Sequence, residues 1–182
     1  MKTLRYLIEY IGLRCGLLLL DSLSLPAAES LATRLANLWF RLDVRRRRIA
    51  EQNILRSRIT GDPSEAARIA LESFRHFGVL VIESLKSGNY LDERNWREHV
   101  ELDVSPASKA LLEKPGQGVM LVSGHLGNWE VAAQVLSHIK PVVGITSAMS
   151  NPYTDKLIKE HKPRNRFTLT PKHDADTLRF LS

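Results

Sequence analysis

Cysteine is nearly absent from this sequence, since Cys15 is the only one among 182 residues. A single cysteine excludes an internal disulfide framework and is typical of a reducing compartment. Neither paired cysteines nor a His-Glu-x-x-His pattern occurs, so no metal site is predicted. Gly116, Gly118 and Gly124 have the wrong spacing for a P-loop or a dinucleotide-binding fingerprint, so no cofactor is predicted either.

Long hydrophobic runs are also absent. Residues 4–25 are mostly apolar but contain four charged residues, and the uncharged stretch Cys15–Leu20 is far shorter than the roughly 20 residues that span a bilayer. No cleavage site follows a hydrophobic core, so no removed signal peptide is expected. The segment instead predicts a helix lying in the membrane interface, or alternatively one packed on the protein's own core. Its apolar face is formed by Leu4, Leu7, Ile8, Ile11 and Leu18.

The charge is basic, +6 at neutral pH, and unevenly distributed. Arg41 and Arg45–Arg48 form one cluster, and a looser cluster lies between Lys156 and Lys172. Such clusters attract anionic lipid headgroups, acidic carrier proteins or nucleic acid, although an ordinary solvated helix face is the alternative for Arg45–Arg48. No nucleic acid partner is predicted, because neither cluster contains the interleaved aromatic side chains on which bases stack.

The periodicity of apolar residues changes at about residue 105. Residues 1–25 are expected to form the membrane-associated helix, and residues 26–104 a helical part, with helices over 28–42, 46–58 and 64–86. Asn95–Val104 is expected to be a short strand or an extended arm, with Trp96 packed. Pro26 is expected to end the first helix.

Residues 105–182 alternate between short apolar runs and helical segments, and Asn128 is suited to cap one helix. This alternation predicts βαβ units and a parallel sheet. The expected fold class is therefore α/β: a helical N-terminal part followed by the first half of a mostly parallel sheet flanked by helices. The expected strands are Gly118–Val122, Pro141–Thr146 and Arg166–Thr170, and the expected helices are 105–112, Trp129–Ser137 and Pro152–Lys162.

The segment Val119–Glu130, VMLVSGHLGNWE, combines a strand-like run with residues suited to catalysis. Open α/β sheets place ligands at the carboxyl ends of their strands, and His125 follows such an end. A histidine with a carboxylate partner, here Glu130, can act as a general base on a hydroxyl. Residues five apart in one helix point about 140° apart, so the two side chains can pair only if the chain turns at Gly127-Asn128. A loop histidine and a solvent-facing glutamate are the alternative.

Other chemistry finds little support in the sequence. A serine hydrolase needs Gly-x-Ser-x-Gly, whereas Leu121 and His125 occupy the two glycine positions around Ser123. Cys15 is far from His125 in the sequence and has apolar neighbours, which argues against a thiol nucleophile. With no nucleophile and no metal, direct transfer in a ternary complex is the mechanism that remains.

The His125–Glu130 segment resembles the His-x4-Asp/Glu box of glycerolipid and lipid A acyltransferases. Upstream, Arg45–Ser57 (RRRRIAEQNILRS) resembles a basic helix of the late acyltransferases of lipid A biosynthesis. Downstream, Asn151-Pro152, Asp155–Ile158 and Arg164 resemble a further block of that family. Three blocks in the right order make the chain similar to the lauroyl/myristoyl acyltransferase type, which includes the phosphatidylinositol mannoside acyltransferases.

The resemblance implies an enzyme that moves a fatty acyl chain from an acyl thioester to a hydroxyl of a membrane glycolipid. The implied donor is acyl carrier protein or coenzyme A, and the implied acceptor is a lipid A precursor, with a phosphatidylinositol mannoside or another lysolipid as the alternative. The implied location is the cytoplasmic face of the bacterial inner membrane.

The same resemblance implies the roles of individual residues. His125 would take the proton from the acceptor hydroxyl, and Glu130 would fix the imidazole tautomer and stabilise the imidazolium. A positive group or a backbone N–H would meet the oxyanion. The implied substrate-binding residues are Arg164, with Arg166 as the second choice for that positive group, and Asn128 and Trp129, which would shape the pocket.

Members of the family usually continue beyond the point that corresponds to Ser182. The chain is therefore expected to be a fragment that lacks the C-terminal part of the site, either of an active enzyme or of an inactive paralogue. A basic membrane-binding module, in which His125 and Glu130 are incidental, is a further interpretation.

Overall fold

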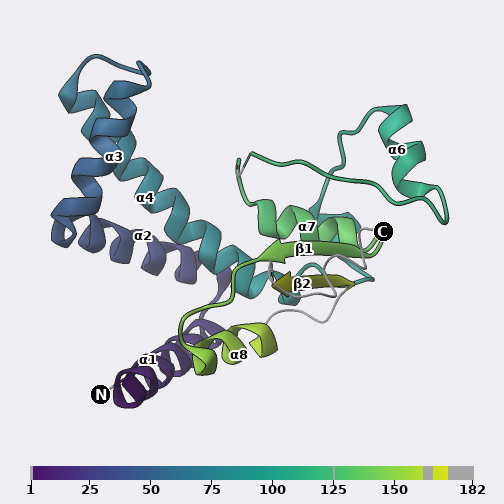
Figure 1. Ribbon diagram of the computed structural model, residues 1–182, viewed down its shortest axis with the longest axis horizontal. Helices are drawn as coiled ribbons and strands as arrows, with labels where there is room; N and C mark the ends of the chain where they lie inside the picture. The colour runs from purple at the N-terminus through teal and green to yellow at the C-terminus, as the bar shows by residue number, and fades with distance from the viewer. Residues whose placement is uncertain (1, 125, 162–165, 172–182) are drawn as a thin grey trace. The chain divides into compact units, whose positions relative to one another are not determined.

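The computed structural model describes residues 2–124, 126–161 and 166–171 (Figure 1). The chain forms two compact units, one of Met1–Leu18 with Leu85–Ser182 and one of Leu19–Ser84. In chain order, the helices and strands are α1 (Lys2–Ser22), α2 (Leu25–Leu42), α3 (Val44–Arg56), α4 (Pro63–Lys86), the 3-10 helix η1 (Ser87–Asn89), α5 (Trp96–His99), α6 (Pro106–Glu113), α7 (Trp129–Ser137), β1 (Val142–Thr146), α8 (Pro152–His161) and β2 (Phe167–Pro171).

The unit Leu19–Ser84 is helical, and small residues let α2 and α4 approach closely. A Cβ atom added at Gly78 of α4 would lie 3.2 Å from the carbonyl oxygen of Ala32, so only glycine fits there without a shift. Ala28 and Ala36, one turn to either side on α2, are also buried. The three helices that the sequence predicts over this unit are confirmed to within about three residues at each end.

Pro26 has a different role from the expected one. The first helix already ends at Ser22, and Pro26 lies in the first turn of α2. A proline costs little there, because the first N–H groups of a helix have no intrahelical acceptor. Proline therefore marks the beginning of the second helix and not the end of the first.

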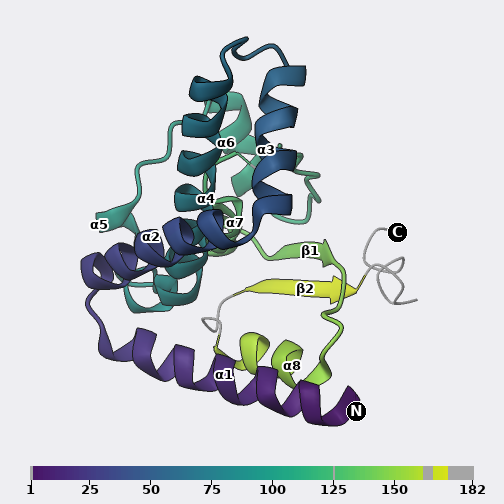
Figure 2. The same ribbon diagram turned by 90° about the vertical axis from the view of Figure 1, so that its left-hand side faces the viewer.

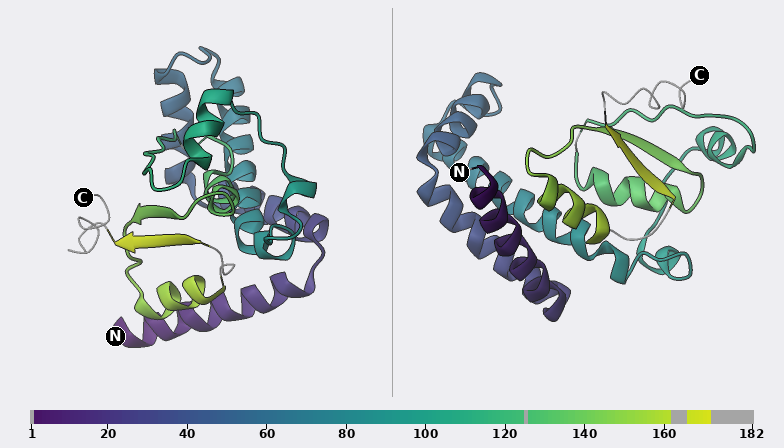
Figure 3. Two further views of the ribbon diagram at one scale, coloured as in Figure 1. Left: turned by 90° about the vertical axis from the view of Figure 1, so that its right-hand side faces the viewer. Right: turned by 60° about the horizontal axis from the view of Figure 1, so that its bottom comes forward.

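The other unit contains the sheet, in which β1 and β2 run parallel and are joined by α8 (Figure 3). The register pairs Val142 with Phe167 and Thr146 with Pro171. Helix α7 packs on both strands. The prediction of an α/β fold with parallel strands is confirmed, and α7 has the predicted bounds.

The core of this unit forms where α7 meets the segment after α4. Leu91, Trp96 and Val135 are buried together. The Trp96 ring stacks on the ring of His138 at 5.7 Å between centroids, and Nε2 of His138 lies 3.0 Å from the Leu91 carbonyl oxygen. The predicted packing of Trp96 is confirmed, although it lies on the single helical turn α5 and not on a strand. The prediction of a short strand or an extended arm is wrong for Trp96–His99, because the Asp92 and Asn95 side chains bind nearby backbone N–H groups and thereby form a turn; residues 100–104 are irregular.

The predicted strand Gly118–Val122 is wrong. The segment is irregular, and the side chains of Met120 and Val122 are 83% and 92% exposed. An apolar run becomes a strand only when a neighbouring strand accepts its hydrogen bonds. In the described part of the chain, β1 and β2 pair with each other, and no strand pairs with this segment.

Candidate active site

The turn between His125 and Glu130 is present. Gly127 has a φ of +61°, a conformation that glycine adopts without strain. The Asn128 side chain then accepts a hydrogen bond from the Val131 N–H at 3.1 Å, which starts α7 at Trp129. This capping was predicted and is confirmed. His125 itself lies outside the described residues, as does Arg164.

Glu130 lies in the first turn of α7 and is half-buried, with its Oε1 atom shielded from solvent. A carboxylate at this position interacts favourably with the positive end of the helix dipole. Trp129, beside it, is also half-buried. The helix thus presents a partly desolvated carboxylate directly after the turn that follows His125, which suits the orientation of an imidazole ring.

Two buried polar residues of α7, Gln134 and Ser137, follow Glu130 along the helix, and the sequence did not predict their role. Gln134 is 2% exposed, and its Oε1 atom accepts a hydrogen bond from the Ser87 hydroxyl at 2.5 Å. The Ser137 hydroxyl donates to the Gln134 carbonyl oxygen at 2.6 Å. A signal was available, because polar residues at 130, 134 and 137 recur at helical spacing on a helix that is otherwise apolar.

Arg166 stabilises the opposite end of the same helix. Its guanidinium group donates to the carbonyl oxygens of Ser137 at 3.1 Å and His138 at 2.9 Å. Cations near a helix C-terminus satisfy the last carbonyl groups in this way. Eight residues separate Glu130 from His138, which corresponds to about 12 Å along the helix axis. Arg166 therefore contacts the end of α7 that is remote from Glu130.

Lys140 organises the loop before the irregular apolar segment. Its ammonium group donates to the carbonyl oxygens of Lys114 at 2.9 Å and Gln117 at 2.7 Å. The residues that follow expose apolar side chains up to His125 and beyond it, namely Val119, Met120, Leu121, Val122 and Leu126. An exposed apolar surface next to a candidate general base suits a substrate that has a hydrocarbon chain.

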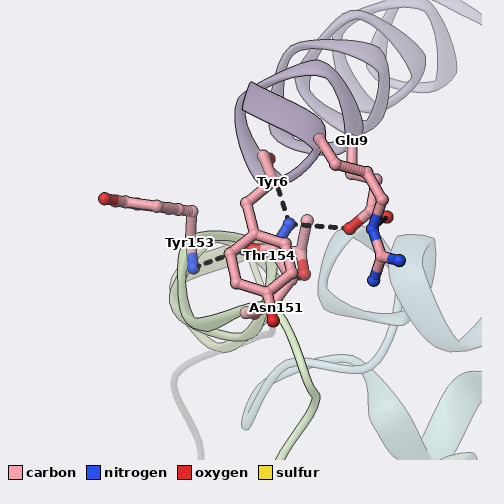
Figure 4. Close-up of polar contacts among 6 residues, drawn as sticks. Tyr6, Glu9, Asn151, Tyr153 and Thr154 are labelled. Carbon is pink, nitrogen blue, oxygen red and sulfur yellow. Dashed lines mark hydrogen bonds and ion pairs between the residues drawn. The ribbon is translucent and has the colours of Figure 1, made fainter. Parts of the chain in front are cut away.

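Asn151 connects α8 to α1 within the same unit (Figure 4). Its amide nitrogen donates to the carbonyl oxygen of Tyr6 at 3.0 Å and to the carboxylate of Glu9 at 2.9 Å. Its amide oxygen accepts from the N–H of Tyr153 at 3.0 Å, in the first turn of α8. Asn151 is 4% exposed. This member of the downstream family block therefore has a structural role, as helix cap and as link to α1.

Asp155 of the same block stabilises α8. Its carboxylate accepts a hydrogen bond from the Lys159 ammonium at 2.6 Å and from the Met149 N–H at 3.1 Å. The Lys159 hydrogen bond, followed by that from Met149, lowers the pKa of the Asp155 carboxyl group. A lowered pKa means that the ionised carboxylate is bound more favourably in the folded chain than in the unfolded one.

Substituting Asp155 with asparagine should lower stability by at most about 1 kcal/mol at neutral pH, as is usual for partly exposed pairs. The contribution is complete above the ordinary carboxyl pKa of 3.8 and is lost as the pH falls through the lowered folded value. Melting curves of both proteins should therefore converge on acidification. Lys156→Ala, which removes only the exposed 3.7 Å pair with Glu160, should melt like the native protein. A difference for Asp155→Asn that persists unchanged in strong acid would contradict the assignment.

In the part of the chain that the structure describes, no group of three or more histidine, cysteine, aspartate or glutamate residues could hold a metal ion. The sequence matches the family model of the bacterial lipid A biosynthesis acyltransferases over residues 1–182. No match was found among curated proteins or among solved structures.

Proposed function

Since the chain belongs to the bacterial lipid A biosynthesis acyltransferase family, we propose that it transfers a fatty acyl chain from acyl carrier protein to a hydroxyl of a lipid A precursor. Coenzyme A is the alternative donor, and a phosphatidylinositol mannoside or another lysolipid is the alternative acceptor. One observation carries the proposal: the chain turns at Gly127, between His125 and Glu130 in the sequence, and Glu130 is half-buried at the start of α7.

In the proposed reaction, His125 removes the proton from the acceptor hydroxyl while the hydroxyl oxygen attacks the carbonyl carbon of the thioester. Glu130 holds the imidazole in the correct tautomer and stabilises the imidazolium. Arg164 is proposed as the cation that meets the oxyanion. When the tetrahedral intermediate collapses, the carbon–sulfur bond breaks and the imidazolium returns the proton to the thiolate. The products are an ester and a free thiol.

The test is an assay of the purified protein in detergent micelles with acyl carrier protein that bears a radiolabelled acyl chain. We expect label to appear in a lipid A precursor, with less label in a phosphatidylinositol mannoside or a lysophospholipid. Replacing acyl carrier protein by acyl coenzyme A identifies the donor. Folded protein that labels none of these acceptors from either donor would contradict the proposed function and favour the inactive paralogue or the membrane-binding module.

We further propose that the protein acts at the cytoplasmic face of the inner membrane. No described helix is long and apolar enough to cross a bilayer. Helix α1 instead has two apolar faces, of which one, including Leu13 and Leu17, is half-buried or buried. The other face is exposed, and Leu4 and Ile8 on it are 66% and 63% accessible. Such a helix suits the membrane interface.

The unit Leu19–Ser84 also has a surface suited to contact with a membrane. Figure 2 labels the backbone of α2 and α3. On α2 and the start of α3, large apolar side chains and arginines are exposed. Apolar side chains flanked by arginine favour an anionic bilayer, because each basic residue near the surface contributes about 1 kcal/mol. The apolar members are Leu35, Leu38, Leu42 and Val44, and the basic members are Arg41, Arg45, Arg46 and Arg48.

Replacing Leu4, Ile8 and Ile11 together by glutamine should weaken binding to anionic vesicles by roughly tenfold to a hundredfold, at somewhat under 1 kcal/mol per side chain. Substitution is preferable to deletion of residues 1–25, because α1 also provides the hydrogen-bond acceptors of Asn151. The three side chains are exposed, so the melting temperature should not change. Vesicle sedimentation measures the binding. Unchanged sedimentation of the triple variant would exclude this face of α1 as the membrane contact.

A further inference from the structure

Gln134 has a hydrogen-bonding capacity that the fold does not use. Its Oε1 atom accepts from Ser87, while its Nε2 atom is buried. Among residues 2–124, 126–161 and 166–171, no acceptor forms a hydrogen bond with Nε2. Buried donors are nearly always paired, so an idle amide N–H in a structurally important helix calls for a functional explanation.

The position of Gln134 in α7 indicates an acceptor. It follows Glu130 by four residues, and side chains four apart in a helix are neighbours, with Cβ atoms about 5–6 Å apart. The Oε1 atom of Glu130 is shielded from solvent, as is the amide. The last torsion of a glutamate side chain rotates easily, so the Glu130 carboxylate can turn toward the amide N–H while Gln134 keeps its hydrogen bond with Ser87.

We propose that Gln134 is a positioning residue for the catalytic pair: held by Ser87, its amide donates a hydrogen bond to the Glu130 carboxylate. This inference rests on the proposed function, because it assumes that Glu130 orients His125. A carboxylate that is held by a second donor keeps one rotamer, and the imidazole that it orients then keeps one direction. Ser87, in the short helix after α4, thereby supports the site across 47 residues of sequence.

The first test is Gln134→Met, which keeps the length and apolar volume of the side chain but removes the amide. Because Glu130 acts on His125 and not on substrate binding, kcat should fall with KM unchanged. Misplacement of a catalytic group by a fraction of an ångström costs roughly tenfold to a hundredfold. Ser87→Ala, a smaller change that keeps the glutamine, should lower kcat in the same direction but less.

A double variant separates positioning from a purely structural role. If Ser87 and Gln134 act through one hydrogen-bond chain, Ser87→Ala with Gln134→Met should lose no more kcat than Gln134→Met alone. The matched control is Ser137→Ala, which removes another buried hydroxyl from α7 and should leave kcat within about twofold of native. All assays are made well below the melting temperature of each variant, with folding checked by circular dichroism.

The outcomes distinguish this inference from the function on which it rests. If kcat of folded Gln134→Met is native, or if its KM rises while kcat is kept, Gln134 does not position Glu130. An equal loss of kcat in Ser137→Ala would also overturn the inference, because general weakening of α7 would then explain the data. If His125→Ala is inactive while Gln134→Met is fully active, only the inference fails. Full activity in His125→Ala would contradict the general-base mechanism on which the inference rests, and absence of transfer by the native protein would contradict the proposed function itself.

Discussion

Replacing His125 by alanine should reduce acyl transfer by roughly a hundredfold to ten-thousandfold, the range typical for loss of a general base. The acceptor hydroxyl is a poor nucleophile while it keeps its proton, and the box His125–Glu130 contains no second histidine to remove it. The loss should appear in kcat measured with labelled acyl donor and lipid acceptor. Binding of the acceptor should change little, because the imidazole acts mainly in the transition state.

Glu130→Gln is the matched variant for the partner residue. It keeps the shape of the side chain and its place in the first turn of α7, but removes the negative charge that stabilises an imidazolium. Transfer should fall, and the melting temperature should stay close to that of the native protein. Near-native transfer by folded His125→Ala would exclude His125 as the general base of the reaction.

Replacing Asn151 by alanine should destabilise the α/β unit by about 3 kcal/mol, with a fall in melting temperature of roughly 6–12 °C. The cap of α8 accounts for about 1 kcal/mol of this value. The hydrogen bond to the Glu9 carboxylate accounts for much of the remainder, because hydrogen bonds to charged groups contribute about 1.5–3 kcal/mol. Thermal unfolding followed by circular dichroism measures the change.

Asn151→Ser separates the two contributions. A serine hydroxyl can still accept the N–H of Tyr153 and cap α8, but it is too short to replace the amide nitrogen at Tyr6 and Glu9. Its stability should lie between those of the native protein and Asn151→Ala. If Asn151→Ala melts with the native protein, α8 and α1 are held together by other contacts, such as the edge-to-face rings of Tyr10 and Tyr153.

Features that depend on nearby residues were predictable from the sequence. The bounds of α7 followed from the Asn128 cap and the apolar spacing after it. The parallel pairing of β1 with β2 followed from the helix of about ten residues between them. The turn between His125 and Glu130 followed from Gly127, whose positive φ is easily adopted only by glycine.

Features that depend on distant partners could not be predicted in the same way. Val119–Val122 has the composition of a strand, but composition does not specify whether a neighbouring strand is available. The hydrogen bond between Ser87 and Gln134 joins positions 47 residues apart, and neither residue type marks its partner. The same holds for Arg166, which the family resemblance named as second choice for the oxyanion cation, and whose bonds to the end of α7 no sequence pattern indicated.

The link between Asn151 and α1 also affects the order of events during synthesis. Tyr6 precedes Asn151 by 145 residues, so the first helix leaves the ribosome about seven to thirty seconds before its partner at ordinary elongation rates. Throughout that interval the side of α1 that includes Tyr6 and Tyr10 lacks its contacts with Asn151 and Tyr153, and the opposite side, with Leu4 and Ile8, is uncovered in any case. A nascent chain with two uncovered apolar sides is prone to aggregate in water. Translation close to a bilayer would shelter α1 until α8 emerges. The yield of native protein should therefore be higher from ribosomes at a membrane than from ribosomes away from one.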